Sequence, residues 1–158
     1  MDLSVYTDAK YAEKADDKRS VSGVAVTVGN STVGWSSSTQ KIVTLSTTDA
    51  EYVVLGDGVK EGLFVEAVLS FIVPSRSEKS IKVLVDKEVA NNQAANAHSS
   101  ARTKRIDGCF HINQELVRTG RIAVEHIPTK EQRAVILTKV LVGAIFKEHR
   151  NFLLNLHE

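Results

Sequence analysis

Three acidic residues stand where a folded chain can bring them together. Asp8 follows a short strand pattern, and Asp86 follows an apolar, β-branched run at residues 81–85. Glu51 lies in the first turn of a predicted helix for which Ser46 is a good N-cap. Open α/β sheets bind ligands at the carboxyl ends of their strands, and Mg²⁺ prefers oxygen ligands, so the three acids are candidates for a metal site. Taken singly, each is better explained as a solvated charge or a helix cap, and spacing alone does not establish the site.

The pattern along the chain alternates between strands and helices. Short alternating or β-branched runs predict strands at residues 3–7, 21–28, 32–37, 41–45, 81–85 and 122–127, with Trp35 packed on one face. Caps, helical spacing and stop signals predict helices at residues 47–73, 87–97, 106–118, 131–139 and 143–156. Three glycines, at positions 56, 58 and 62, weaken the first helix and predict a bend or an unusually close neighbour. This order predicts an α/β fold, a mixed sheet with helices on its faces, and the lack of a linker or repeat predicts one domain over residues 1–158.

Length and composition describe an ordinary globular protein. Of the 158 residues, 42% are hydrophobic and 25% are charged, and the formal net charge is +1. With this net charge the protein has no overall electrostatic attraction for nucleic acid, so any surface that binds nucleic acid must be a local basic patch. Cys109 is the one cysteine, which excludes an internal disulfide, and no apolar run approaches the roughly 20 residues of a membrane span. The N-terminal residues lack a signal-peptide pattern, so we expect an intracellular protein, cytoplasmic or nuclear, without membrane contact.

Several short runs, in order over nearly the whole chain, carry a family resemblance. They are Tyr6-Thr7-Asp8-Ala9, residues 19–23, Trp35-Ser36-Ser37 with Gln40-Lys41, residues 45–52, Asp86 with Asn92-Gln93-Ala94, residues 102–107, Phe110-His111-Ile112, and Pro128-Thr129 with Thr138-Lys139. On these runs the chain resembles the ribonuclease H domain at the end of copia-type LTR retrotransposon polyproteins. Together the runs are highly specific, although any one of them alone is not.

The resemblance implies a fold, a reaction and a set of ligands. The implied fold is ribonuclease H-like, a five-stranded mixed sheet flanked by helices. The implied reaction is cleavage of the RNA strand of an RNA:DNA hybrid with two divalent metals, Mg²⁺ or Mn²⁺, about 4 Å apart. The implied metal ligands and catalytic residues are Asp8, Glu51 and Asp86.

The departures from the family pattern concentrate at that site. Val135 stands where the family has its fourth acid, and no rotamer of valine can ligate a metal. Lys10 stands where a second aspartate is usual, and Lys87 follows Asp86 where asparagine is usual. A lysine ammonium beside Asp8 or Asp86 would neutralise charge that otherwise attracts metal, and the alternative is that both lysines point to solvent.

A basic segment precedes the predicted helix at residues 106–118. Arg102, Lys104 and Arg105 could hold the phosphates of a hybrid duplex, although a solvated loop explains them equally well. With a net charge of only +1, we expect at best weak, salt-sensitive binding of nucleic acid through these residues.

Two functions are compatible with these observations. The first is a retroelement-derived ribonuclease H-like domain that is catalytically impaired and acts as a protein- or nucleic-acid-binding module, with a protein partner favoured and no cofactor required. The alternative is an active metal-dependent endoribonuclease that cuts the RNA strand of RNA:DNA hybrids. The departures clustered around Asp86, at Lys10 and at Val135 favour the first function, because a fold can outlive its reaction.

Overall fold

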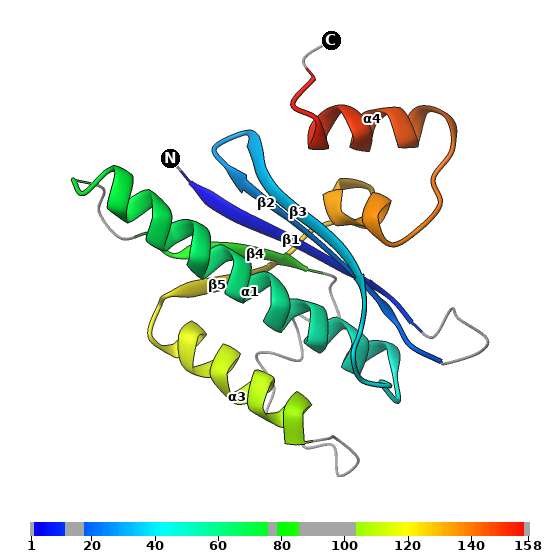
Figure 1. Cartoon of the computed structure of the whole chain (residues 1–158), viewed down its shortest axis with the longest axis horizontal. Coiled ribbons are helices and arrows are strands. Elements are labelled where there is room, and N and C mark those ends of the chain that lie inside the picture. The colour runs from blue at the N-terminus through cyan, green and yellow to red at the C-terminus, as the bar shows by residue number, and fades with distance from the viewer. Residues whose placement is uncertain (1, 12–17, 76–78, 86–103, 157–158) are drawn as a thin grey trace.

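The computed structural model describes residues 2–11, 18–75, 79–85 and 104–156 (Figure 1). The helix predicted at residues 87–97 lies outside these ranges, as do Asp86, Lys87 and Arg102.

A five-stranded mixed sheet forms the centre of the fold. The strands are β1 (Leu3–Lys10), β2 (Val21–Val28), β3 (Ser31–Thr39), β4 (Ile81–Val85) and β5 (Ile122–His126). Their order in the sheet is β3-β2-β1-β4-β5. The pairs β1–β2 and β2–β3 are antiparallel, while β1–β4 and β4–β5 are parallel. The mixed sheet predicted from the sequence is therefore confirmed.

Helices cover both faces of the sheet (Figure 1). The long helix α1 (Thr47–Ile72) and α3 (Lys104–Arg118) lie on one face. The short 3-10 helices η1 (Thr129–Glu131) and η2 (Arg133–Leu137) lie on the other face, followed by α4 (Gly143–Leu153). Along β1, buried residues alternate with half-buried ones, which is the period of a strand that lies between two unequal layers. The buried members of β1 face α1, so Asp8 points to the opposite face, toward η2.

Helix α1 begins and packs as its sequence predicts. The Ser46 side chain caps it by accepting a hydrogen bond from the main-chain nitrogen of Asp49 at 3.0 Å. A Cβ atom added at Gly62 would lie 2.9 Å from Cγ2 of Val5, and one added at Gly58 would collide with Thr7. The expected close neighbour of Gly58 and Gly62 is thus the central strand, and these glycines let the helix backbone approach it. The close neighbour of Gly56 is instead Cys109 on α3, whose Sγ would lie 3.3 Å from an added Cβ.

Some predicted elements are wrong or shorter than expected. Residues 41–45 form no strand, because side-chain hydrogen bonds hold this segment instead: Gln40 binds Ser22 and the main chain of Ala50, and Ser20 binds Thr44. Trp35 does not pack into the core, since 65% of its surface is exposed. The helix predicted at residues 131–139 consists of the two 3-10 helices, and the last helix ends at Leu153 rather than at residue 156.

The hydrophobic core lies between α1 and the sheet. Its members share nearly complete burial and come from β1, β2, β4, β5, α1 and α3, with Val5, Val54, Leu55, Ile81 and Val83 fully buried. None of the helices in the described part of the chain combines the length and the apolar character needed to cross a bilayer.

Candidate active site

A cleft of about 390 Å³ opens where the carboxyl end of β1 meets the first turn of α1. Its other wall comes from the segment between β5 and η2 and from the residues that follow η2. Asp8, Lys10, Glu51, Gln132 and Lys139 all line it. The end of β1, the start of α1 and the 3-10 segment therefore place polar side chains around one concave surface.

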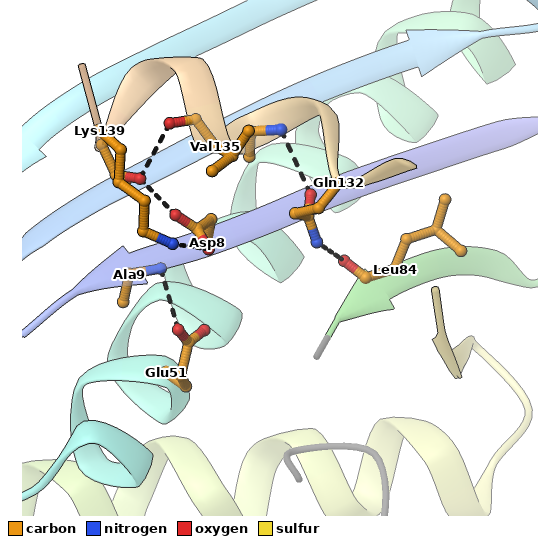
Figure 2. A network of polar contacts seen from close by, with 9 residues as sticks. Asp8, Ala9, Glu51, Leu84, Gln132, Val135 and Lys139 are labelled. Carbon is orange, nitrogen blue, oxygen red and sulfur yellow. Dashed lines mark hydrogen bonds and ion pairs between the residues drawn. The ribbon is translucent and has the colours of Figure 1, made fainter. Parts of the chain in front are cut away.

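Asp8 is held on both carboxylate oxygens by consecutive residues after η2. The hydroxyl of Thr138 donates a hydrogen bond to Oδ2, and Nζ of Lys139 lies 3.2 Å from Oδ1 (Figure 2). The Asp8 side chain is 13% exposed and the Lys139 side chain 38%. The carboxylate is thus largely removed from water but is compensated by a cation and a hydroxyl.

Glu51 reaches the same strand from the other side of the cleft. Its Oε1 accepts a hydrogen bond from the main-chain nitrogen of Ala9 at 3.1 Å (Figure 2). This contact ties the first turn of α1 to the residue directly after Asp8. The structure therefore brings two of the three expected acids to one cleft, while the third, Asp86, lies outside the described residues.

Val135 lies on η2, and its side chain is buried, with 6% of the residue exposed. Its carbonyl oxygen accepts hydrogen bonds from the main-chain nitrogens of Thr138, at 3.2 Å, and Lys139, at 2.9 Å. These bonds turn the chain so that Thr138 and Lys139 both point at Asp8 (Figure 2). Val135, expected from the sequence at the position of the fourth acid, is thus connected to Asp8 through the turn that follows it.

Two further contacts fix η2 on the sheet. Gln132 accepts a hydrogen bond from the nitrogen of Ala134 at 3.3 Å, as N-cap of η2, and its Nε2 donates to the carbonyl of Leu84 on β4 at 3.1 Å. Gly23, the cross-strand partner of Asp8, leaves room for the helix, since a Cβ there would lie 2.9 Å from the carbonyl oxygen of Ala134. The network therefore spans β1, β4, α1 and η2.

The predicted lysines have different outcomes. Lys10 lies two residues after Asp8 on the same side of β1 and lines the cleft, while Lys87 lies outside the described residues. Among the described residues, Lys139 contacts Asp8, a role that was not predicted for it from the sequence. Its position four residues after Val135 was the available signal, because residues with that spacing share one face of a helix.

The expected phosphate-binding residues lie at the edge of the described chain or beyond it. Arg102 lies outside the described residues, and Lys104 and Arg105 are the first two residues of α3. Their contact with the phosphates of a hybrid stays a prediction.

The donor atoms of the cleft suit a hard divalent cation in type, because Asp8 and Glu51 present carboxylate oxygens. Within the described ranges, no three histidine, cysteine, aspartate or glutamate residues come close enough to hold a metal ion. Both described acids are also engaged by the protein itself, Asp8 by Lys139 and Glu51 by Ala9. A metal site would therefore need a further ligand, for which Asp86 is the expected residue, and a rearrangement of at least one of these contacts.

The sheet order and the helices on its two faces define a ribonuclease H-like fold. The chain superimposes on LC11-RNase H1, isolated from compost by a metagenomic approach, with a TM-score of 0.60 and 18% identity over 86% of this chain and 91% of that one. On the same enzyme in complex with an RNA/DNA hybrid, the TM-score is 0.55 over 85% of this chain and 92% of that one.

In sequence, the chain is similar to Pol polyproteins of plant transposons. It is 34% identical over 139 residues, 88% of its length, to the retrovirus-related Pol polyprotein from transposon TNT 1-94 of Nicotiana tabacum. It is 31% identical over 147 residues, 93% of its length, to that from transposon RE2 of Arabidopsis thaliana. The chain spans 10% of each polyprotein, and no family model matches it. It is thus similar, over most of its length, to one segment of these retrovirus-related Pol polyproteins.

Proposed function

We propose that this chain is a ribonuclease H-like domain derived from a retrotransposon polyprotein, and that it binds its ligand without efficient turnover. The observation that carries the proposal is Val135, a buried apolar residue at the position where the family motif has its fourth acid. The side chain of valine offers no oxygen to a cation and no group that can accept a proton. A site that lacks this carboxylate should bind divalent metal more weakly and should cleave slowly.

The remaining residues keep part of the inherited arrangement. Asp8 and Glu51 would hold a divalent cation together with Asp86, and the cation would activate water and stabilise the leaving oxygen. Gln132 would keep η2 against β4, so that the two acids stay opposite the 3-10 segment. This residual set supports the alternative function, a metal-dependent endoribonuclease that cuts the RNA strand of hybrids. The hybrid complex of LC11-RNase H1, which shares the fold, is the observation that favours it.

A protein is the favoured ligand of the impaired domain. β3 is an edge strand and exposes Val33 and Trp35, and α4 exposes Ile145 and Phe146. Asn155 occupies the main-chain nitrogen and carbonyl of Thr32 on this edge, so the exposed apolar side chains carry the argument, since such patches are typical of surfaces that bind other chains. The net charge of +1 supports only weak, salt-sensitive binding of nucleic acid.

The deciding experiment measures cleavage of a labelled RNA:DNA hybrid in Mg²⁺ and in Mn²⁺. We expect Val135→Asp to cleave at least ~100-fold faster than the natural chain, the scale of one restored catalytic group. Val135→Asn is the matched control, because asparagine has nearly the same size and shape as aspartate but carries no carboxylate. Equal rates for the natural chain and Val135→Asp would show that the valine is not the limiting defect.

Binding is tested separately from turnover. Hybrid affinity is compared at low and physiological salt, next to recovery of protein partners on the immobilised chain, with Trp35→Ser and Ile145→Ser as surface variants. We expect hybrid binding to fall steeply with salt and the surface variants to lose the recovered proteins. Tight hybrid binding at physiological salt, with no protein above background, would favour the enzyme instead.

A further inference from the structure

Lys139 occupies the place of a counter-cation at Asp8. Its Nζ lies 3.2 Å from Oδ1, and the other carboxylate oxygen is bound by the hydroxyl of Thr138. Because the Asp8 side chain is only 13% exposed, its charge needs compensation from within the protein or from a bound ion. The Lys139 ammonium supplies this compensation from within the protein.

The main chain fixes the position from which this lysine reaches the cleft. The nitrogen of Lys139 donates to the carbonyl of Val135 at 2.9 Å, and the nitrogen of Thr138 donates to the same carbonyl at 3.2 Å. η2 itself is pinned to β4 by Gln132 and packs closely over Gly23. The position of the ammonium beside Asp8 is therefore set by a turn that main-chain hydrogen bonds hold in place.

We infer that Lys139 is a built-in competitor for divalent cations at Asp8. A metal ion that ligates Oδ1 would lie close to the ammonium, and the repulsion between the two cations opposes their joint occupancy of that carboxylate. The ammonium and the metal ion therefore oppose each other at Asp8. Replacing Lys139 by a neutral residue should strengthen metal binding by the coupling factor between the two. Such couplings are typically about 5- to 150-fold, and we expect at least ~10-fold here because the carboxylate is largely buried. The inference deepens the proposed function, on which it rests for the inherited metal-binding role of Asp8.

The test measures Mn²⁺ binding to the full chain by calorimetry and by electron paramagnetic resonance of free Mn²⁺, without nucleic acid. We expect Lys139→Gln and Lys139→Met to lower the Kd for Mn²⁺ at least ~10-fold, and Lys139→Arg, which keeps the charge, to leave it unchanged. The control for net charge is Lys60→Gln, since Lys60 lies on α1 in an exposed pair with Asp57 and does not line the cleft. Circular dichroism confirms the fold of each variant, and Lys139→Met retains the aliphatic stem if Lys139→Gln is unstable.

The outcomes separate the two proposals. Unchanged Mn²⁺ affinity in both neutral variants, or an equal gain in Lys60→Gln, would overturn the role of Lys139. Tighter Mn²⁺ binding without hybrid cleavage would support the inference and leave Val135 as the limiting defect. Tighter binding together with cleavage as fast as in Val135→Asp would support the inference and refute the assignment of the defect to Val135.

Discussion

The carboxylate of Glu51 accepts a hydrogen bond from the main-chain nitrogen of Ala9 at 3.1 Å, one residue beyond Asp8. The contact gives Glu51, expected from the sequence to be a metal ligand, a structural role, because it joins the first turn of α1 to the end of the central strand. Each of the two described acids therefore has a partner within the protein: Glu51 binds the main chain and Asp8 binds Lys139.

This contact predicts different outcomes for two substitutions of Glu51. Glu51→Ala leaves the part-buried nitrogen of Ala9 without this acceptor, so we expect a loss of about 1–2 kcal/mol in the free energy of unfolding. Glu51→Gln keeps a side-chain oxygen at the same reach and should lose less than half as much. Urea denaturation of both variants at neutral pH measures the difference. Equal losses would mean that the charge of Glu51, and not its hydrogen bond, stabilises this corner.

The close approach of α1 to β1 predicts opposite effects for two glycine substitutions. A Cβ at Gly58 would collide with the Thr7 side chain and lie 3.1 Å from Val5, so Gly58→Ala should cost about 1–3 kcal/mol. Gly108 lies within α3, and no atom of the described residues comes within 4 Å of a Cβ added there. Gly108→Ala should therefore stabilise the protein by about 0.5–1 kcal/mol through helix propensity. Thermal unfolding of both variants tests the pair, and a gain in stability for Gly58→Ala would refute the close packing described for α1.

Local signals explain which elements were predictable. Val21–Val28 has the bounds expected from its alternation and from the turn at Gly29, which has a φ of 61°. The helix after Ser46 was also predictable from a local signal, the capping side chain of Ser46. Residues 41–45 resemble a strand locally, but side-chain hydrogen bonds from Gln40 and Ser20 hold them in another path, and such tertiary contacts leave no periodic pattern.

In the site as well, some features were predictable from local sequence patterns and others depend on tertiary contacts. The motif order marked Asp8, Glu51 and Val135, and the structure brings the first two to one cleft. The contact between Lys139 and Asp8 joins residues 131 positions apart. It depends on the 3-10 geometry of η2 and on the space above Gly23, neither of which the sequence pattern specifies.

An aspartate at position 135 should lower the free energy of unfolding as long as no metal ion is bound. Val135→Asp places a carboxylate at a position that is 6% exposed, so we expect the free energy of unfolding to fall by about 1–3 kcal/mol without metal. A divalent ion that binds the folded state alone should recover part of this loss. The melting temperature of Val135→Asp should therefore rise with Mn²⁺ and saturate, while that of Val135→Asn should not. A Mn²⁺-dependent rise of equal size in both variants would show that the new carboxylate takes no part in binding.

A buried histidine on α4 predicts how stability depends on pH. Burial lowers the pKa of His149 below its ordinary value of 6.5, and the nearby Arg133 lowers it further, against an opposing effect of Glu148. The unfolded chain therefore binds more protons than the folded chain between the lowered pKa and 6.5, so stability is lost as the pH falls through this window. Urea denaturation at pH 7.5 and pH 5.5 should show this loss in the natural chain. The loss should be smaller in His149→Gln, which cannot titrate, whatever the absolute stability of that variant. An identical decrease in both proteins would assign the pH dependence to other groups.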